Sequence, residues 1–438
     1  MLRPWPTILT VVLLAATACT AADPADGADP RCGGCALARR RPTASVGATL
    51  TGPAPSMSGR RQPVRARLGA LMLVAVLAAC TSTTESPPPA DTAAGTDDLA
   101  DRVARSDDLL ARTLSPEEPG CSGAVGVEGE VVWAAARGTA DLATGRALTP
   151  TTTFDIASVS KQFTATAVLL LAQEGRLALD DPVSRWVPDL PAWSDEVTID
   201  QLVHHTSAIP DYTTLLVAAG HELSEQTTQQ QAIAAIARIQ SLNEGMRGRF
   251  DYSNSNYILL AEVIEQAAQQ PLPEFARTHI FEPLALDMVI DPYGASPDNT
   301  QPSSARSYGL NLTSEQWEPA GSRWEQLGDG SIQTTPAELV RWADNYRTGR
   351  LGGPQLIDAQ LGTTTTASPG DERYGAGLFI TPDGALSHDG GWAGFTTTFH
   401  VSADHRVAIA VSCNGADPRA TADLQTLTGG LQAEWAEA

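Results

Sequence analysis

Ser158 and Lys161 are three residues apart in the stretch "FDIASVSKQFTATAVLLLAQEG", residues 154–175. The chain holds 29 basic residues, and Lys161 is its only lysine. Arginine does not deprotonate in a protein, whereas a lysine removed from water can act as a base. The composition therefore predicts that position 161 needs an amine that can lose its proton. A lysine left there by chance is the alternative.

A buried helix is predicted to hold this pair. Residues 163–172 are apolar almost all round, which is typical of a helix in the middle of a domain, and Gly175 is placed to end it. Positions i and i+3 share a helix face, so the amine can reach the hydroxyl. The N–H groups at the helix N-terminus suit an oxyanion, and apolar neighbours favour the neutral amine. Lys161 is thus predicted to activate Ser158 as a nucleophile.

A second group of chemically capable residues occurs in "FDYSNSNYILL". Tyr252 and Asn254 are two residues apart in a loop that enters a helix, so both side chains can project into one cleft. The phenol can carry a proton, and the amide can orient a substrate carbonyl. A loop that only caps the helix is the alternative interpretation.

The third group is "LSHDGGWAGFTT", residues 386–397. His388 ends a predicted strand, and the glycines after Asp389 allow close approach of the backbone. The N–H of Gly391 would then provide a second donor to an oxyanion. A purely structural histidine at a strand end is the alternative.

The elements that position these groups predict an α+β fold. "GAVGVEGEVVWAAARG" is typical of a hairpin turning at Glu128–Gly129, and short strands recur near the other end of the chain. Between them lie helices, with capping boxes predicted at 198–201 and 335–338. Strands at both ends imply one antiparallel sheet that unites the chain termini.

With these three motifs in this order, the chain resembles the serine β-lactamases and penicillin-binding proteins. The resemblance is to their class C-like branch, which includes D-alanyl-D-alanine carboxypeptidases, D-aminopeptidases and esterases. It covers about residues 115–435 and includes "LVHHTSAIPDY" and "GDGSIQTTPAELVRWA". It implies a β-lactamase-like three-layer fold, with helices on both faces of the central antiparallel sheet and a helical subdomain.

The resemblance also implies a role for each matching residue. Ser158 would be the acylated nucleophile, Lys161 its general base, and Tyr252 a proton relay. The N–H groups of Ser158 and Gly391 would form the oxyanion hole. The substrate-binding set would comprise Asn254, His388, Asp389, Gly390, Gly391 and Trp392, although Trp392 fits core packing equally well. No cofactor is expected.

Two residues depart from the pattern of typical β-lactamases. Position 388 is His where those enzymes have Lys, and position 389 is Asp where the family usually has a Thr or Ser that helps to bind a substrate carboxylate. If repulsion by Asp389 costs about 1–3 kcal/mol, affinity for such a carboxylate falls roughly 5- to 150-fold. This favours neutral esters or amides as substrates.

The predicted function is therefore an exported serine hydrolase that works through an acyl-enzyme on Ser158. Esterase activity ranks first, D-alanyl-D-alanine carboxypeptidase activity (cleavage of a D-amino-acid peptide) second, and β-lactamase activity third. A catalytically silent cell-wall sensor is the alternative from another class. Such proteins commonly lose a catalytic side chain, whereas this chain retains all of them.

Charge and composition exclude other classes. The formal charge of −22 argues against nucleic acid as a partner, and 42% hydrophobic residues indicate a globular protein. His204 and His205 have no cysteine or carboxylate at zinc-like spacing nearby, so no metal site is expected.

The first hundred residues are typical of an export region. Residues 57–80 have an arginine-rich start, an apolar run too short to span a bilayer permanently, and the ending "LAAC". This predicts a signal with a lipobox, lipidated at Cys80 and translated from Met57, within an export region of residues 1–80. An ordinary cleaved signal without lipid is the alternative. Residues 81–106 are predicted to be a disordered tether, followed by the hydrolase domain over 107–438.

Cys121 and Cys413 each stand beside a strand-like run. Export implies an oxidising compartment, so this pair is predicted to form a disulfide between the first and last strands. Two buried free thiols are the alternative.

Overall fold

The computed structural model describes residues 93–367 and 371–436. The predicted signal, the start at Met57, lipidation at Cys80 and the first part of the tether lie outside the described residues. Within the described part, no helix is long and apolar enough to cross a membrane.

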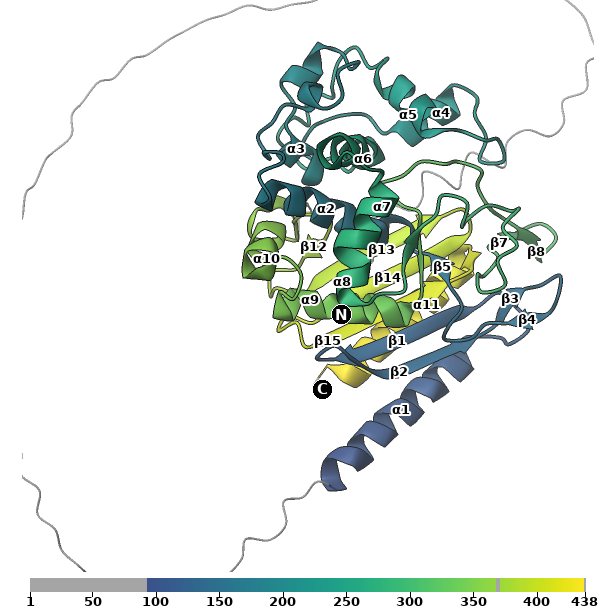
Figure 1. The fold of residues 1–438 in the computed structure, drawn as a ribbon. Helices are drawn as coiled ribbons and strands as arrows, with labels where there is room; N and C mark the ends of the chain where they lie inside the picture. The colour runs from purple at the N-terminus through teal and green to yellow at the C-terminus, as the bar shows by residue number, and fades with distance from the viewer. Residues whose placement is uncertain (1–92, 368–370, 437–438) are drawn as a thin grey trace, which may run out of the picture. The chain divides into compact units, whose positions relative to one another are not determined.

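An eight-stranded antiparallel sheet forms the centre of the fold (Figure 1). Its strand order is β10-β11-β12-β13-β14-β15-β1-β2, so the first strand lies between the second and the last long strand. This confirms the α+β fold whose sheet unites both ends of the chain. The strands are β1 (Cys121–Val127), β2 (Glu130–Arg137), β10 (Thr365–Thr366), β11 (Arg373–Tyr374), β12 (Phe379–Ile380), β13 (Leu386–Trp392), β14 (Phe395–Val401) and β15 (Val407–Cys413).

The β1–β2 hairpin turns where the sequence predicted. Glu128 has φ 51° and Gly129 has φ 87°. A two-residue turn with positive φ at both central positions has the twist that the flanking strands need. The Glu128 N–H donates to the carbonyl of Arg406, the residue directly before β15 (2.7 Å).

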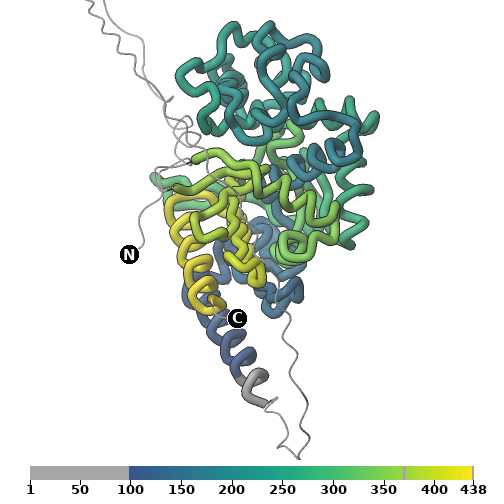
Figure 2. Tube along the Cα trace, turned by 90° about the vertical axis from the view of Figure 1, so that its left-hand side faces the viewer, coloured from purple at the N-terminus to yellow at the C-terminus, as the bar shows by residue number. Residues whose placement is uncertain are grey.

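Helices cover both faces of the sheet. On one face, α1 (Ala93–Thr113) and α11 (Pro418–Trp435) lie side by side (Figure 2). The opposite face carries the larger core, built with α2 (Lys161–Gln173), α6 (Asn254–Ala268) and α9 (Pro336–Thr348). The fold therefore has the three layers that were expected, helix on sheet on helix.

Helix α1 corrects the predicted boundary between tether and domain. It begins at Ala93, so residues 93–106 are helical rather than part of a disordered tether. Val103, Ser106 and Leu110 recur at helical spacing and face α11, which the tether interpretation overlooked. The Trp435 indole N–H donates to the Ser106 hydroxyl (3.1 Å), and Arg105 pairs with Glu434 (2.8 Å).

Smaller elements surround the two ends of the sheet. A short three-stranded sheet, in the order β5-β9-β6, leads into α2. Helices α3, α4 and α5 form the helical subdomain beside α6 (Figure 1). The bounds are β3 (Thr139–Asp141), β4 (Arg146–Ala147), β5 (Phe154–Asp155), β6 (Val289–Ile290), β7 (Tyr308–Asn311), β8 (Gln316–Pro319), β9 (Ile332–Thr334), β16 (Gly415–Ala416), α3 (Ile199–Val203), α4 (Tyr212–Ala218), α5 (Gln229–Ile236), α7 (Leu272–Ala276), α8 (Glu282–Leu284) and α10 (Gly353–Gly362).

A disulfide joins Cys121 of β1 to Cys413 of β15. The two residues are directly opposite in the antiparallel register, and 292 positions separate them in the sequence. Both side chains belong to the cluster that α1 and α11 cover.

Candidate active site

Ser158 lies in a single 3₁₀ turn, Ala157–Ser160, which connects β5 to α2. The expected helix is present, but it begins at Lys161, three residues after the serine. Ala157, directly before the serine, has φ 49°, so a regular helix cannot extend back through this residue. Ser158 is half-buried and Lys161 is fully buried.

The Lys161 amine has three hydrogen-bond acceptors around it. Its Nζ lies 3.0 Å from Ser158 Oγ, 2.9 Å from Asn254 Oδ1 and 2.7 Å from the Asp329 carbonyl oxygen. In the neutral amine, the lone pair can point at the serine while the two N–H bonds remain donors to the other oxygens. The arrangement can therefore take the proton from Ser158 as its oxygen attacks a carbonyl.

Tyr252 and Asn254 approach the same amine from the start of α6. The Lys161 Nζ is 5.0 Å from the centroid of the Tyr252 ring, and this ring stacks on His205 at 4.3 Å. The Asn254 backbone N–H donates to Asp211 Oδ2 (2.7 Å), which fixes the start of α6 beside the amine. The structure thus brings four predicted site residues together from two distant segments.

His388 on β13 completes the aromatic wall of the site. Its Nδ1 is 2.7 Å from the Asp389 carbonyl oxygen, which can only accept, so Nδ1 carries the proton. Its Nε2 faces the Tyr374 hydroxyl at 3.4 Å, and its ring centroid is 6.3 Å from that of Tyr252. Burial, with a contribution from the charge of Lys161, lowers the pKa of His388 to about 3. The imidazole is therefore neutral at physiological pH.

The residues after His388 bring the β13 backbone against the Ser158 turn. A Cβ at Gly390 would be 2.3 Å from the Ile156 carbonyl oxygen and 3.1 Å from the Ser158 nitrogen, so only glycine fits. Gly391 follows directly on this strand. Trp392 is half-buried, and its ring packs 5.8 Å from that of Trp324.

Asp389 places a carboxylate on the exposed side of β13. Surrounding protein atoms partly remove this carboxylate from water, and this desolvation raises the pKa of Asp389 above its ordinary value. A hydrogen bond from Thr398 opposes the shift. Burial, followed by repulsion from Asp389, raises the pKa of the Glu372 carboxyl. Among the ion pairs of the described residues, none involves Asp389.

Several residues that line the site were not predicted from the sequence. Asp329 supplies the carbonyl that accepts from Lys161, and its carboxylate accepts from the Tyr212 hydroxyl (3.1 Å). Burial raises the pKa of the Asp329 carboxyl, while Lys161 lowers it. These groups come from segments far apart in the sequence, the start of α4 for Tyr212 and the loop before β9 for Asp329, and no spacing pattern relates them to Ser158.

The two adjacent histidines are structural. His205 Nδ1 accepts from the Ser253 N–H (3.2 Å) and lies 2.9 Å from the Asn256 amide, while burial lowers its pKa well below the ordinary value. His204 Nδ1 is 2.9 Å from the Asp200 carbonyl oxygen. Within residues 93–367 and 371–436, no group of three His, Cys, Asp or Glu side chains is arranged to hold a metal ion.

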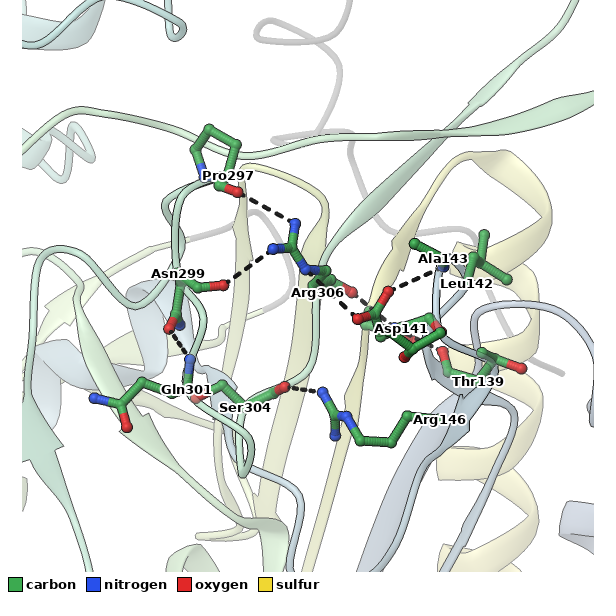
Figure 3. A network of polar contacts seen from close by, with 12 residues as sticks. Thr139, Asp141, Leu142, Ala143, Arg146, Pro297, Asn299, Gln301, Ser304 and Arg306 are labelled. Atoms are coloured by element: carbon green, nitrogen blue, oxygen red, sulfur yellow. Dashed lines mark hydrogen bonds and ion pairs between the residues drawn. The ribbon is translucent and has the colours of Figure 1, made fainter.

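A cavity of about 620 Å³ lies beside the 291–302 loop, and none of the candidate site residues named above lines it. The loop connects to the site through the Asp291 N–H, which donates to the Ser331 carbonyl (2.8 Å), next to Gly330 and the Ser158 turn. Arg306 stabilises the loop from behind, because its guanidinium donates to the carbonyls of Pro297 (3.2 Å) and Asn299 (3.3 Å) (Figure 3). This loop is thus joined by one backbone hydrogen bond to the segment that lies beside the Ser158 turn.

The sequence and the fold both match known proteins. The sequence model of the family described as "Beta-lactamase" matches residues 90–432. Penicillin-binding protein 4* of Bacillus subtilis is 28% identical over 312 residues, which cover 64% of this chain and 65% of that protein. A D-aminopeptidase of Brucella anthropi is 27% identical over 312 residues, covering 70% of this chain and 58% of the enzyme. The chain thus spans less than two thirds of the length of these relatives.

A solved structure shows the same fold. The octameric penicillin-binding protein homologue from Pyrococcus abyssi superimposes with a TM-score of 0.63 at 24% identity, over 77% of this chain and 78% of that chain.

Proposed function

The chain belongs to the beta-lactamase family, and from that premise we propose that it is an exported serine hydrolase, cleaving esters or amides through an acyl-enzyme on Ser158. The contact that supports this role for Ser158 is the 3.0 Å approach of the Lys161 amine to its hydroxyl.

The proposed reaction has two halves. Lys161 takes the Ser158 proton as Oγ attacks the substrate carbonyl, and the N–H groups of Ser158 and Gly391 bind the resulting oxyanion. The proton then passes to the leaving alcohol or amine, with Tyr252 as relay, and the C–O or C–N bond breaks. Water hydrolyses the acyl-Ser158 ester by the same proton transfers in reverse, with Asn254 orienting the acyl group.

The setting of His388 and Asp389 supports the substrate class: His388 Nδ1 donates to the Asp389 carbonyl at 2.7 Å, and the Asp389 carboxylate lies on the exposed side of the same strand. A neutral imidazole has no charge to offer a substrate carboxylate, and the adjacent Asp389 carboxylate repels one. Penicillins and peptides with a C-terminal D-alanine both carry a carboxylate close to the scissile bond. Esters or amides that are neutral at this position are therefore the favoured substrates, with esterase activity first.

Amides of D-amino acids are the second candidate. They are favoured by the similarity to D-aminopeptidases, which is 27% over 70% of this chain. Carboxypeptidase and β-lactamase activities rank below them, because they need a carboxylate to bind beside Asp389. A silent cell-wall sensor is disfavoured, because each motif residue keeps a side chain able to do chemistry.

Turnover of a short-chain p-nitrophenyl ester against a chromogenic cephalosporin tests this proposal, with residues 82–438 as the enzyme. We expect rapid ester cleavage and negligible lactam cleavage. Ser158→Ala is the control, and it should lose both ester turnover and covalent labelling by a fluorophosphonate. Persistent labelling of Ser158→Ala would overturn the assignment of the nucleophile, and faster cephalosporin cleavage would overturn the substrate class.

Export and lipid anchoring at Cys80 belong to the same proposal. They are supported by the arginine-rich start, the apolar run and the "LAAC" ending of residues 57–80. Expression of the full chain in a bacterium, with Cys80→Ser as the matched control, tests them. We expect the protein in the membrane fraction and the variant in the soluble extracytoplasmic fraction; equal distribution of the two would argue against the lipid.

A further inference from the structure

We propose that Asp155 is the positioning residue for the nucleophile: its carboxylate holds the strained turn that presents Ser158. This inference rests on the proposed function, because it assigns Asp155 a role in acylation of that serine. Asp155 itself does not touch the serine hydroxyl or the Lys161 amine, so its action is through the backbone.

The turn needs such a support because its backbone is strained. Ala157 has φ 49°, a conformation that a residue with a Cβ adopts rarely and that glycine adopts freely. Asp155 Oδ1 accepts a hydrogen bond from the Ala157 N–H at 2.7 Å. A side chain that binds the backbone two residues further on stabilises a turn of this kind locally.

The carboxylate is itself held from the neighbouring strand. Gln333 is opposite Asp155 in the β5–β9 register, and its Nε2 donates to Asp155 Oδ2 at 2.9 Å. Asp155 is only 2% exposed, so both of its oxygens are fixed inside the protein. A buried carboxylate is unfavourable unless its hydrogen bonds are made, and here one of them goes to the turn that carries the nucleophile.

The opposite side of the turn has no free space. Gly390 of β13 approaches so closely that a Cβ would be 2.3 Å from the Ile156 carbonyl and 3.1 Å from the Ala157 Cβ. The turn is therefore fixed between the Asp155 carboxylate and the β13 backbone, which also supplies the proposed oxyanion donor at Gly391. Loss of the Asp155 support would change both the 3.0 Å approach of Lys161 to Ser158 and the alignment of the oxyanion hole.

A double-mutant cycle between Asp155→Ala and Ala157→Gly tests this inference. The measured quantity is the rate of Ser158 acylation by a fluorophosphonate, with ester kcat and KM beside it. We expect Asp155→Ala to slow acylation about 10- to 100-fold, mainly in kcat, since the expected loss is of geometry at the serine. In the Ala157→Gly background the same change should slow it less than about fivefold, because glycine accepts the positive φ without support.

Asp155→Asn is the matched conservative variant. It keeps an oxygen acceptor for the Ala157 N–H, and the Gln333 side-chain amide can turn its oxygen, which has no partner among the described residues, towards the new N–H₂ group. We expect its acylation rate to stay within about threefold of the parent. This variant keeps the inference testable even where Asp155→Ala fails to fold, because a large loss in Asp155→Asn would contradict support of the turn by an oxygen acceptor.

The outcomes that overturn the inference are distinct. Equal slowing by Asp155→Ala in both backgrounds, or a loss in Asp155→Asn as large as that in Asp155→Ala, would show that support of the turn is not its role. Absence of Ser158 labelling in the unmodified protein would overturn the proposed function, and the inference with it.

Discussion

At the scale of single residues, the buried amine of Lys161 is the group on which the proposed chemistry depends. It is fully buried and meets oxygens of Ser158, Asn254 and Asp329. A guanidinium in its place would keep the positive charge but lose the ability to accept a proton. The only lysine of the chain is thus placed where arginine would leave the serine without a base.

Chemical rescue distinguishes a base from a mere cation at this position. Lys161→Ala should reduce Ser158 acylation at least about 100-fold, which is the order of a general-base contribution. Ethylamine added to the buffer should restore part of the rate, increasing with pH as the free amine accumulates. Guanidinium at the same low concentration serves as the control and should restore nothing; equal rescue by both ions would contradict the role of base.

Asp389 is predicted to set the discrimination against carboxylates. Asp389→Thr should raise the acylation rate by a penicillin roughly 5- to 150-fold, the range that about 1–3 kcal/mol of relieved repulsion gives. Cleavage of a neutral p-nitrophenyl ester should change little, and this substrate is the internal control. The two rates are measured on the same preparations; an unchanged penicillin rate would show that Asp389 does not determine substrate choice.

Asp155 should also make stability depend on pH. Burial raises its pKa to about 6 from 3.8, against the hydrogen bonds of Ala157 and Gln333. Between these two values the folded state retains a proton that the unfolded state releases, so this carboxyl makes the protein less stable as pH rises through the window. The total effect is on the order of 3 kcal/mol, from about two pKa units.

Asp155→Asn removes that dependence. Its free energy of unfolding, measured in urea, should exceed that of the parent by a margin that grows from pH 4 to pH 7. Asp291 and Asp329 lie close enough to contribute to the charge around Asp155, and both remain in the variant. A constant difference across this pH range would contradict the raised pKa.

Spacing alone indicates residues of the site only where their relationship is local, and His388 and Gly391 were grouped with Ser158 by the family resemblance. Ser158 and Lys161 share one turn, and Tyr252 and Asn254 share one loop, so spacing alone indicates them. The support by Asp155 depends on the positive φ of Ala157, which no pattern of side chains shows. The contact between Lys161 and the Asp329 carbonyl joins positions 168 residues apart.

At the scale of elements, α1 is where the sequence interpretation and the fold differ. The Ser/Thr/Pro/Ala-rich composition of residues 81–92 is typical of a tether, and the tether prediction wrongly extended to residues 93–106, whose apolar side chains recur at helical spacing.

Only half of the capping box predicted at 335–338 is present, because a contact from another segment competes for one of its side chains. Thr335 does accept from the Glu338 N–H (3.3 Å), but a tertiary contact, from the Asp287 N–H (3.1 Å), takes the Glu338 carboxylate.

Truncation tests whether residues 93–106 belong to the folded domain. A chain that begins at Asp107 loses the part of α1 that carries Val103 and Ser106, which covers Trp435 and its neighbours on α11. We expect its Tm to fall by several degrees relative to a chain that begins at Ala93, since burial of apolar surface is lost. Leu99→Ala in the longer chain is the control, because Leu99 is 41% exposed; equal Tm for both chains would restore the tether interpretation.

At the scale of the whole molecule, the central sheet is complete only when strands from the early and late parts of the sequence pair. β1 pairs with β15, so the first strand depends on residues almost three hundred positions later. The Cys121–Cys413 disulfide crosses this pair of strands, on the face covered by α1 and α11, whereas Ser158 and Lys161 lie with the helices of the opposite face. The bond is therefore placed to stabilise closure of the sheet without contributing to the site.

Removing the disulfide should separate stability from activity. Cys121→Ser together with Cys413→Ser should lower the free energy of unfolding by about 2–5 kcal/mol, because the unfolded chain regains the freedom that a long closed loop denies it. Ester turnover at 25 °C should be unchanged, as β1 and β15 still pair. Reductant serves as the control: it should lower the free energy of unfolding of the parent by the same amount and leave that of the double variant unchanged. A loss of activity at 25 °C in a folded double variant would contradict this expectation. It would mean that the pairing of β1 with β15 affects the geometry at Ser158 through β13 and β14, although the disulfide and Ser158 lie on opposite faces of the sheet.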